Sequence, residues 1–236
     1  MVSSYSRIKM FDGVKQSVTD KVQQAKLNRD PFPYLYIQDF FPADFYVQLD
    51  SLFPTQSQLT SITNKAFKPV SNPVQGRSTL TIFNREVEYK EIEGYPHSKQ
   101  SIEFRLFVNS FLVPLIASKL EIQLPTQWDD DTRFVLDQIG YVKHPHTDHP
   151  MKTFSILIYM SNSLSGTSIL RPKQLEFMDN YGNDHPFRKF DEVFNPPFVP
   201  NALLAFPRTD TSFHSVTRLR RADEYRKAIH INVRPL

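Results

Sequence analysis

The sequence of 236 residues contains no cysteine and only six glycines, against 18 prolines. The absence of cysteine excludes disulfide bonds, thiol nucleophiles, iron–sulfur clusters and zinc sites built on thiolates. No run of about 18 apolar residues is present, so we expect no membrane-spanning segment. Residues 1–13 are polar and lack the apolar core of a signal peptide. The absence of a signal peptide and of a membrane span favours an intracellular (cytoplasmic) protein.

Charge and composition narrow the classes of function further. The chain has 28 Lys and Arg against 25 Asp and Glu, which leaves a formal net charge of +3. This near balance argues against a nucleic-acid partner, although the sequence pI is about 9.0. We find no internal repeat, no low-complexity tract and no linker between folding units, so a single domain over 1–236 is expected.

The N-terminal part of the chain is predicted to be largely helical. Apolar residues recur at helical spacing within 14–27, and Pro42 is placed to begin a second helix. A third helix is predicted to run from 98 toward 112 and to meet Pro114 near its end. Downstream, the acidic run 129–131 has the character of a solvated turn.

The C-terminal part is predicted to consist of strands. Six short segments are rich in β-branched and aromatic residues and are bounded by turn formers: 134–139, 153–160, 168–170, 202–206, 213–217 and 227–233. Many short strands of this kind favour a sandwich or barrel. We therefore expect an α+β, mainly β fold with N-terminal helices packed on one sheet, divided into an N-terminal helix (1–32), helical support with the first strands (33–132) and a β core (133–236).

The pattern richest in chemistry lies in 144–149, where three histidines and one aspartate occur within six residues. On an extended segment His146 and Asp148 point to the same side, because side chains alternate between the two faces. Two histidines and one carboxylate on one face of a metal form the facial triad of non-haem Fe(II) oxygenases. The second histidine would have to come from a distant strand. A His-x-acid pair is weak evidence alone, since it also arises by chance.

Two downstream residues, His214 and Arg226, add to the evidence for a metal site. His214 follows the apolar run 202–206 and a loop, and Arg226 opens a segment that alternates like a strand. A guanidinium offers a planar fork that matches a carboxylate, and it stays charged at any working pH. An ordinary ion pair at a strand edge is the alternative reading of Arg226.

Taken in order, these residues resemble the 2-oxoglutarate/Fe(II)-dependent dioxygenase superfamily, and within it the prolyl-4-hydroxylase-like branch. The resemblance rests on the order and spacing of a set that comprises His146-Thr-Asp148, a strand with Tyr159 at its end, Gly166-Thr167, His214 and Arg226. The segment 33–42, ahead of a predicted helix, is also similar to the entry segment of that family. Ala228 departs from the pattern, because a hydroxyl residue is often found there.

The resemblance implies a fold, a set of cofactors and a reaction. The fold would be a double-stranded β-helix, which is jelly-roll or cupin-like. His146, Asp148 and His214 would hold Fe(II), while Arg226 and Tyr159 would bind the far carboxylate of 2-oxoglutarate. The enzyme would use O2 to hydroxylate an unactivated C–H bond, with 2-oxoglutarate converted to succinate and CO2 and with ascorbate in support. The substrate would be a prolyl or other amino-acid side chain, in a peptide, in a protein or free.

Several further residues have two readings each. His144 could replace a ligand or be exposed, His230 could line the pocket or be a satisfied core histidine, and Tyr141 could belong to the pocket or the core. Thr167 is a candidate for the pocket through the family pattern. The long segment 171–201 is expected to contain a hairpin or to act as a lid.

Two other functions compete with the hydroxylase. One is a non-catalytic β-sandwich that serves as a binding or structural module, and it predicts no Fe(II)-dependent binding of 2-oxoglutarate. The other is a cupin-type metalloenzyme that does not use 2-oxoglutarate and would not need Arg226. The compact form without cysteine is similar to small oxygenases of bacteria and their viruses, which suggests a bacterial or viral origin.

Overall fold

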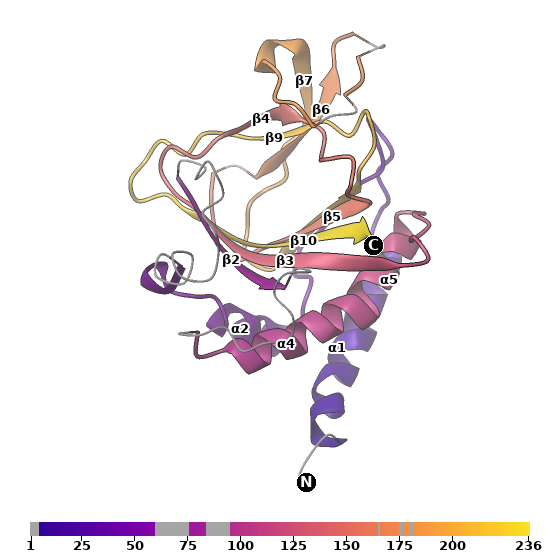
Figure 1. Ribbon diagram of the computed structural model, residues 1–236, viewed down its shortest axis with the longest axis vertical. Coiled ribbons are helices and arrows are strands. Elements are labelled where there is room, and N and C mark those ends of the chain that lie inside the picture. The colour runs from indigo at the N-terminus through magenta and orange to yellow at the C-terminus, as the bar shows by residue number, and fades with distance from the viewer. Residues whose placement is uncertain (1–4, 60–75, 84–94, 165, 175–176, 180–181) are drawn as a thin grey trace.

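The structure is a computed structural model, and it describes residues 5–59, 76–83, 95–164, 166–174, 177–179 and 182–236. Two antiparallel sheets face each other, and helices cover the outer side of the larger sheet (Figure 1). The mixed α and β composition with mainly antiparallel strands agrees with the sequence prediction.

The larger sheet carries the strands that the sequence pattern predicts best. Its strand order is β1-β8-β5-β10-β3-β2, and its neighbours pair antiparallel. The bounds are β1 Leu35–Ile37, β2 Arg77–Phe83, β3 Trp128–Asp137, β5 Phe154–Tyr159, β8 Ala202–Pro207 and β10 Arg226–Pro235. The register places Asp137 opposite Arg226 on one side and opposite Arg77 on the other. These three side chains therefore share one face of the sheet.

The smaller sheet has the order β4-β9-β6-β7 and lies across from the inner face of the larger one (Figure 1). Its strands are β4 Lys143–His146, β6 Thr167–Pro172, β7 Phe190–Phe194 and β9 His214–Val216. β6 and β7 form an antiparallel pair, of which β7 and only the last two residues of β6 lie within 171–201. The pairing of β4 with β9 sets His146 directly opposite His214.

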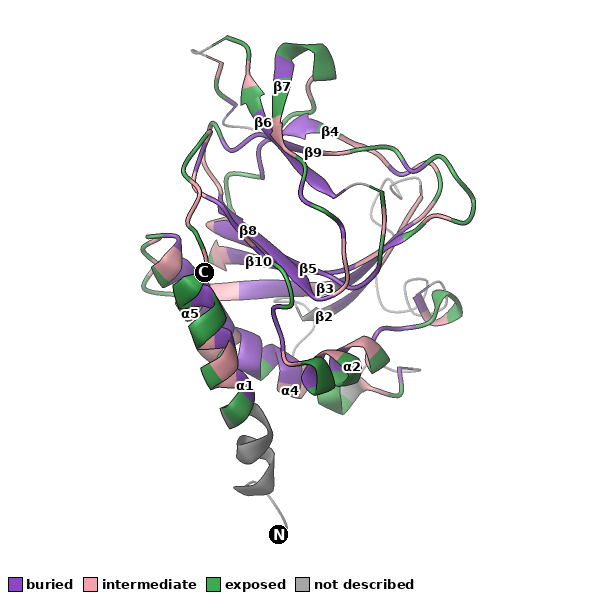
Figure 2. Ribbon diagram, turned by 180° about the vertical axis from the view of Figure 1, so that it is seen from behind, coloured by how far each residue is buried: buried purple, intermediate pink, exposed green. Residues whose placement is uncertain are grey.

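The helices bury the outer face of the larger sheet. They are α1 Tyr5–Gln24, α2 Ala43–Ser51, α4 Ser98–Phe107, the π-helical turn η1 Val108–Leu112 and α5 Val113–Lys119. Alternate residues of β5 and β10, such as Ile156 and Ile229, join one apolar core with Val18, Phe45 and Phe107 from the helices. Each such large apolar side chain contributes roughly 1.5–3 kcal/mol when fully buried. In Figure 2 the central strands of the larger sheet are largely purple, and the helices are purple over parts of their length.

The opposite face of the larger sheet points between the two sheets. Leu157 and Tyr159 of β5 and Ala228 of β10 belong to a second core there, together with Leu204 and Phe206 of β8. Because side chains alternate along a strand, Arg226, Ala228, His230 and Asn232 of β10 form one row on this inner face. The inner face thus combines an apolar floor with a polar row.

The third predicted helix does not stop at Pro114. The chain passes through the π-helical turn η1 and continues as α5, with Pro114 in its first turn. A proline lacks the amide donor that a helix interior requires, and a change of hydrogen-bond pattern just before it accommodates that loss. The whole stretch Lys99–Lys119 is long and apolar enough to cross a membrane by length and composition, but 50% of its most apolar part is buried inside the molecule.

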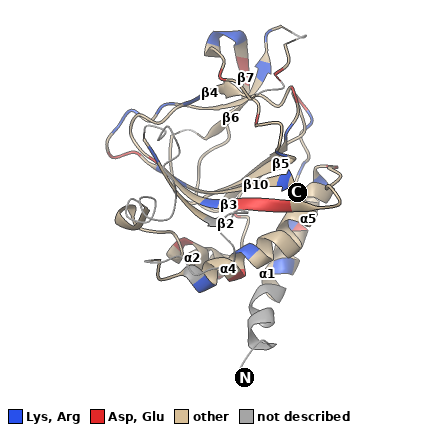
Figure 3. Ribbon diagram, in the orientation of Figure 1, with Lys and Arg blue, Asp and Glu red and all other residues tan. Residues whose placement is uncertain are grey.

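The acidic run 129–131 is not a solvated turn, and that prediction was wrong. The run belongs to β3, where Figure 3 shows it in red, and Asp130 and Asp131 are buried. Asp130 contacts Arg105 of α4 on the helical side of the sheet, whereas Asp131 pairs with Arg133 and Arg234. The arginines on the two faces of the sheet offset the free-energy cost of burying these carboxylates.

Candidate metal centre

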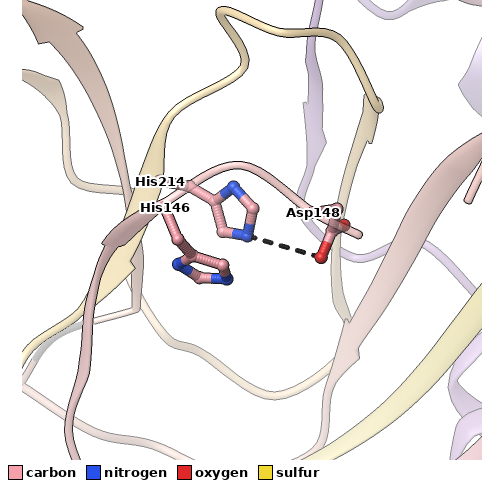
Figure 4. A group of neighbouring side chains, drawn as sticks. All are labelled: His146, Asp148 and His214. Carbon is pink, nitrogen blue, oxygen red and sulfur yellow. Dashed lines mark ion pairs between the residues drawn. The ribbon is translucent and has the colours of Figure 1, made fainter. Parts of the chain in front are cut away.

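Three side chains from two separated segments meet between the sheets. His146 ends β4, Asp148 follows two residues later, and His214 begins β9 (Figure 4). Their potential ligand atoms all lie within 4.8 Å of one another, and each residue is buried. The ring centroids of the histidines are 4.3 Å apart, and Nε2 of His214 is 4.0 Å from Oδ1 of Asp148. No other group of three potential ligands of this kind occurs in the described residues.

Backbone carbonyls orient both imidazoles. Nδ1 of His146 donates a hydrogen bond of 2.8 Å to the carbonyl oxygen of His144, and Nδ1 of His214 donates one of 3.0 Å to that of Ser212. A carbonyl oxygen can only accept, so the proton of each neutral ring sits on Nδ1. The lone pair of each ring is then on Nε2, as a metal ligand requires.

The surroundings keep both rings neutral. Burial lowers the pKa of both histidines, and for His146 the decrease is large because His214 and Lys143 add to it. Two neutral imidazoles are the protonation state that binds a divalent cation. The tautomer and the protonation state therefore agree with a metal-binding role.

The carboxylate of Asp148 is ionised and held from two sides. Burial alone would raise its pKa, but the ammonium group of Lys152 and the hydrogen bonds from Lys152 and Ser155 outweigh burial and hold the pKa well below its usual range. Nζ of Lys152 lies 2.7 Å from Oδ1, and Oγ of Ser155 donates a hydrogen bond of 2.6 Å to Oδ2. Two neutral imidazoles and one anionic oxygen donor fit Fe(II) in the facial arrangement.

A second cluster lies where β2, β3 and β10 meet. Arg226 is almost wholly buried, and it donates a hydrogen bond of 2.9 Å to the carbonyl oxygen of Thr217. Its Nε atom is 3.8 Å from Oδ2 of Asp137. Arg77 approaches the same carboxylate with two hydrogen bonds, of 2.5 Å from Nε and 2.9 Å from Nη2. The guanidinium of Arg77 also lies 3.9 Å from the ring centre of Tyr141, and that of Arg226 lies 5.9 Å from it.

Tyr159 is also buried, at the end of β5. Its hydroxyl oxygen accepts a hydrogen bond of 3.3 Å from the amide of Thr167, and its ring stacks on Phe198 at 4.1 Å. Burial raises the pKa of Tyr159 to about 12, so the hydroxyl keeps its proton and can donate it in a further hydrogen bond. Burial likewise raises the pKa of Tyr141 to about 12.

The three remaining candidates for the pocket, His144, His230 and Thr167, lie in different environments. The side chain of His144 is exposed, and its ring lies 5.1 Å from that of Phe187, so only the carbonyl group of His144 contacts the candidate ligands, through its hydrogen bond with His146. His230 lies on the inner face of β10, opposite Leu157 of β5 and Arg133 of β3. Thr167 is buried and contributes its amide to Tyr159.

Three residues of these clusters were not found from the sequence. Arg77 is separated from Asp137 by 60 positions, and no local pattern reveals the pairing of β2 with β3. Lys152 and Ser155 do follow Asp148 closely in the chain. Lys152 and Ser155 lie four and seven residues after the candidate ligand, and this closeness was the available signal. The sequence does not show, however, that the turn between β4 and β5 brings both side chains back to Asp148.

The comparisons with known proteins concern the fold. No protein-family model and no curated protein matches the sequence. Among solved structures, an oxidoreductase of the 2OG-Fe(II) oxygenase family from Burkholderia pseudomallei aligns with a TM-score of 0.52 and 12% identity, covering 94% of this chain and 91% of that one. A prolyl-4-hydroxylase from Pseudomonas putida aligns with a TM-score of 0.50 and 16% identity, covering 94% and 98%.

A third similar structure contains ligands. HygX from Streptomyces hygroscopicus, with nickel and 2-oxoglutarate bound, aligns with a TM-score of 0.51 and 9% identity, covering 99% of this chain and 88% of HygX. The family resemblance inferred from the sequence is thus confirmed at the level of the fold. The chain has the fold of the 2-oxoglutarate/Fe(II) oxygenases.

Proposed function

We propose that this protein is an Fe(II)/2-oxoglutarate-dependent oxygenase that hydroxylates an unactivated C–H bond. The observation that carries the proposal is the convergence of His146, Asp148 and His214, whose ligand atoms lie within 4.8 Å of one another inside a fold of this class. When bound, the metal and 2-oxoglutarate supply the oxidative chemistry, and succinate and CO2 leave as products. In this proposal the two sheets form a double-stranded β-helix within one domain.

The chain's own residues prepare the centre for the metal. The carbonyl groups of residues 144 and 212 fix the imidazole rings, so Nε2 of each ring is directed to the shared position. Ser155 holds one oxygen of Asp148 in place. Ordered donors of this kind lower the cost of assembling a coordination sphere.

The second cluster is suited to the diacid. Arg226 is a permanent cation on the inner face, and we propose that it binds the far carboxylate of 2-oxoglutarate. The protonated hydroxyl of Tyr159 would donate a second hydrogen bond to that carboxylate. Tyr141, Thr167 and His230 line the remaining pocket in this proposal.

The substrate is proposed to be a prolyl or other amino-acid side chain, in a peptide, in a protein or free. The structural likeness to a prolyl-4-hydroxylase supports this class. A small natural product is the second candidate, because SnoK, a non-heme alpha-ketoglutarate-dependent carbocyclase from nogalamycin biosynthesis, aligns with a TM-score of 0.54. A screen that includes both peptides and small cyclic metabolites separates the two candidates.

The proposal is tested by turnover without an added substrate. Purified protein supplied with Fe(II), 2-oxoglutarate, ascorbate and O2 is expected to form succinate slowly, and Asp148→Ala is expected to form none. His144→Ala is the matched control, because that side chain is exposed and outside the centre. Equal succinate formation by wild type and Asp148→Ala would refute the proposal. Loss of activity in Arg226→Ala together with intact metal binding would separate this enzyme from a cupin that does not use 2-oxoglutarate.

A further inference from the structure

An acidic side chain stands next to the proposed anchor for 2-oxoglutarate. Oδ2 of Asp137 is 3.8 Å from Nε of Arg226, and both residues are buried on the inner face. A carboxylate in this position attracts the guanidinium and repels an incoming carboxylate. If Asp137 and Arg226 were alone, their charges would cancel, and the pocket would offer a diacid no net attraction.

Arg77 changes this balance. Its guanidinium makes a two-point contact with both carboxylate oxygens of Asp137, at 2.5 and 2.9 Å. Two-point contacts of this type fix the geometry of both partners. The 3.8 Å separation between Nε of Arg226 and Oδ2 of Asp137 is longer than a hydrogen bond. The carboxylate of Asp137 therefore accepts hydrogen bonds from Arg77 and not from this nitrogen of Arg226.

The backbone is built to bring Arg77 to this place. Gly76 has a positive φ of 76°, and a Cβ atom there would lie 2.6 Å from the amide nitrogen of Tyr141. The amide of Gln138 also donates a hydrogen bond of 2.7 Å to the carbonyl oxygen of Gly76. This close approach sets the start of β2 against the end of β3, and it places the Arg77 guanidinium 3.9 Å from the Tyr141 ring.

We propose that Arg77 is a positioning residue for 2-oxoglutarate, which neutralises Asp137 and thereby keeps this carboxylate from cancelling the charge of Arg226. Within this trio of side chains, two guanidiniums, from Arg77 and Arg226, stand against the one carboxylate of Asp137. The ligand's far carboxylate then completes a balanced set of four charges. This inference rests on the proposed function, because it assumes that Arg226 is the anchor. It assigns to Arg77 no contact with the ligand.

The test measures equilibrium binding rather than turnover. Titration calorimetry of 2-oxoglutarate into the Ni(II)-loaded protein gives a dissociation constant for each variant. We expect Arg77→Gln to weaken binding about tenfold or more, because Asp137 then cancels Arg226. We expect Asp137→Asn to bind at least as well as wild type. The double variant Arg77→Gln/Asp137→Asn should return to within about threefold of wild type, since it restores the single net cation.

A conservative variant and a control distinguish charge from structure. Arg77→Lys keeps the cation but not the planar fork, so it should bind better than Arg77→Gln. Arg105→Gln removes a buried arginine from acidic partners on the helical side of β3, and it should leave the dissociation constant unchanged even if it lowers stability. Thermal unfolding of every variant reports whether the fold is intact, and the double variant still tests the proposal if Arg77→Gln unfolds.

The outcomes separate this inference from the proposed function. No binding by the Ni(II)-loaded wild type would overturn both. Binding by wild type with an Arg77→Gln constant within about twofold of it would overturn only the role of Arg77. A double variant as weak as Arg77→Gln would also overturn it, because a structural defect is not rescued by removing the opposing charge.

Discussion

Nζ of Lys152 lies 2.7 Å from Oδ1 of Asp148, the carboxylate oxygen that faces His214 at 4.0 Å. This ammonium keeps the carboxylate ionised, but its positive charge also opposes a divalent cation at the same oxygen. We expect Lys152→Met to raise the affinity for Ni(II) or Fe(II) about tenfold at neutral pH, as measured by calorimetry. Lys173→Met, which removes a lysine paired with Asp191 on the β6–β7 hairpin, is the control and should have no effect. Unchanged affinity in Lys152→Met would mean that the ammonium moves away when the metal binds.

His214→Ala should abolish tight binding of a divalent cation. The substitution removes one of three ligands, and a chain with two ligands holds a metal far less well. Added Ni(II) should raise the unfolding temperature of wild type but not of His214→Ala, because a ligand that binds only the native state stabilises it by about 2.7 kcal/mol at 100 times its dissociation constant. His144→Ala should behave as wild type, since its ring is exposed. A metal-dependent shift of equal size in all three proteins would contradict the assignment of the ligands.

The sequence permits prediction of those parts of the molecule that depend on local order. Alternation on an extended segment pairs His146 with Asp148, and the β-prone runs correspond to β3, β5, β8 and β10. The distant candidate ligand His214 lies between two such runs, which is the sequence signal for it. These features follow from periodicity, which is a property of neighbouring residues.

Other parts depend on contacts between distant segments and could not be predicted in this way. The acidic run 129–131 has the composition of a turn, yet arginines from α4 and β10 neutralise it inside a strand. The position of Arg77 depends on the register of β2 against β3. The passage of the third helix through Pro114 depends on a π-helical turn stabilised by burial of Val108 and Leu112. Tertiary contacts therefore override the local preference at each of these sites.

His230 should make the free energy of unfolding fall in acid. Burial lowers its pKa well below the ordinary value near 6.5, and the cations Arg77, Lys152 and Arg133 lower it further, while Asp148 acts in the opposite direction. The unfolded chain takes up a proton below about pH 6.5 while the native state does not, so protonation favours unfolding. Stability from the neutral ring is therefore complete above pH 6.5 and is lost as the pH falls, by up to about 1.4 kcal/mol per pH unit.

This pH dependence is measured by urea denaturation of wild type and His230→Gln between pH 8 and pH 5. Other buried groups also titrate, but they contribute equally to both proteins. We expect the difference in stability between the two to shift in favour of His230→Gln as the pH falls below about 6.5. A difference that stays constant across this range would show that the ring accepts a proton in the native state as easily as in the unfolded chain.

Gly76→Ala should lower stability and weaken 2-oxoglutarate binding together. The residue has a positive φ of 76°, and an added Cβ would lie 2.6 Å from the Tyr141 amide nitrogen and 2.7 Å from the Ile139 carbonyl oxygen. Both neighbours are backbone atoms, so the start of β2 has to move, at a cost on the order of 1–3 kcal/mol. Arg77 is the next residue and would be displaced from Asp137. Gly13→Ala is the matched control, because nothing lies within 4 Å of its added Cβ and alanine favours the helix α1 by up to about 1 kcal/mol. Loss of stability in Gly76→Ala with full affinity for 2-oxoglutarate would mean that Arg77 is not held in place by this turn.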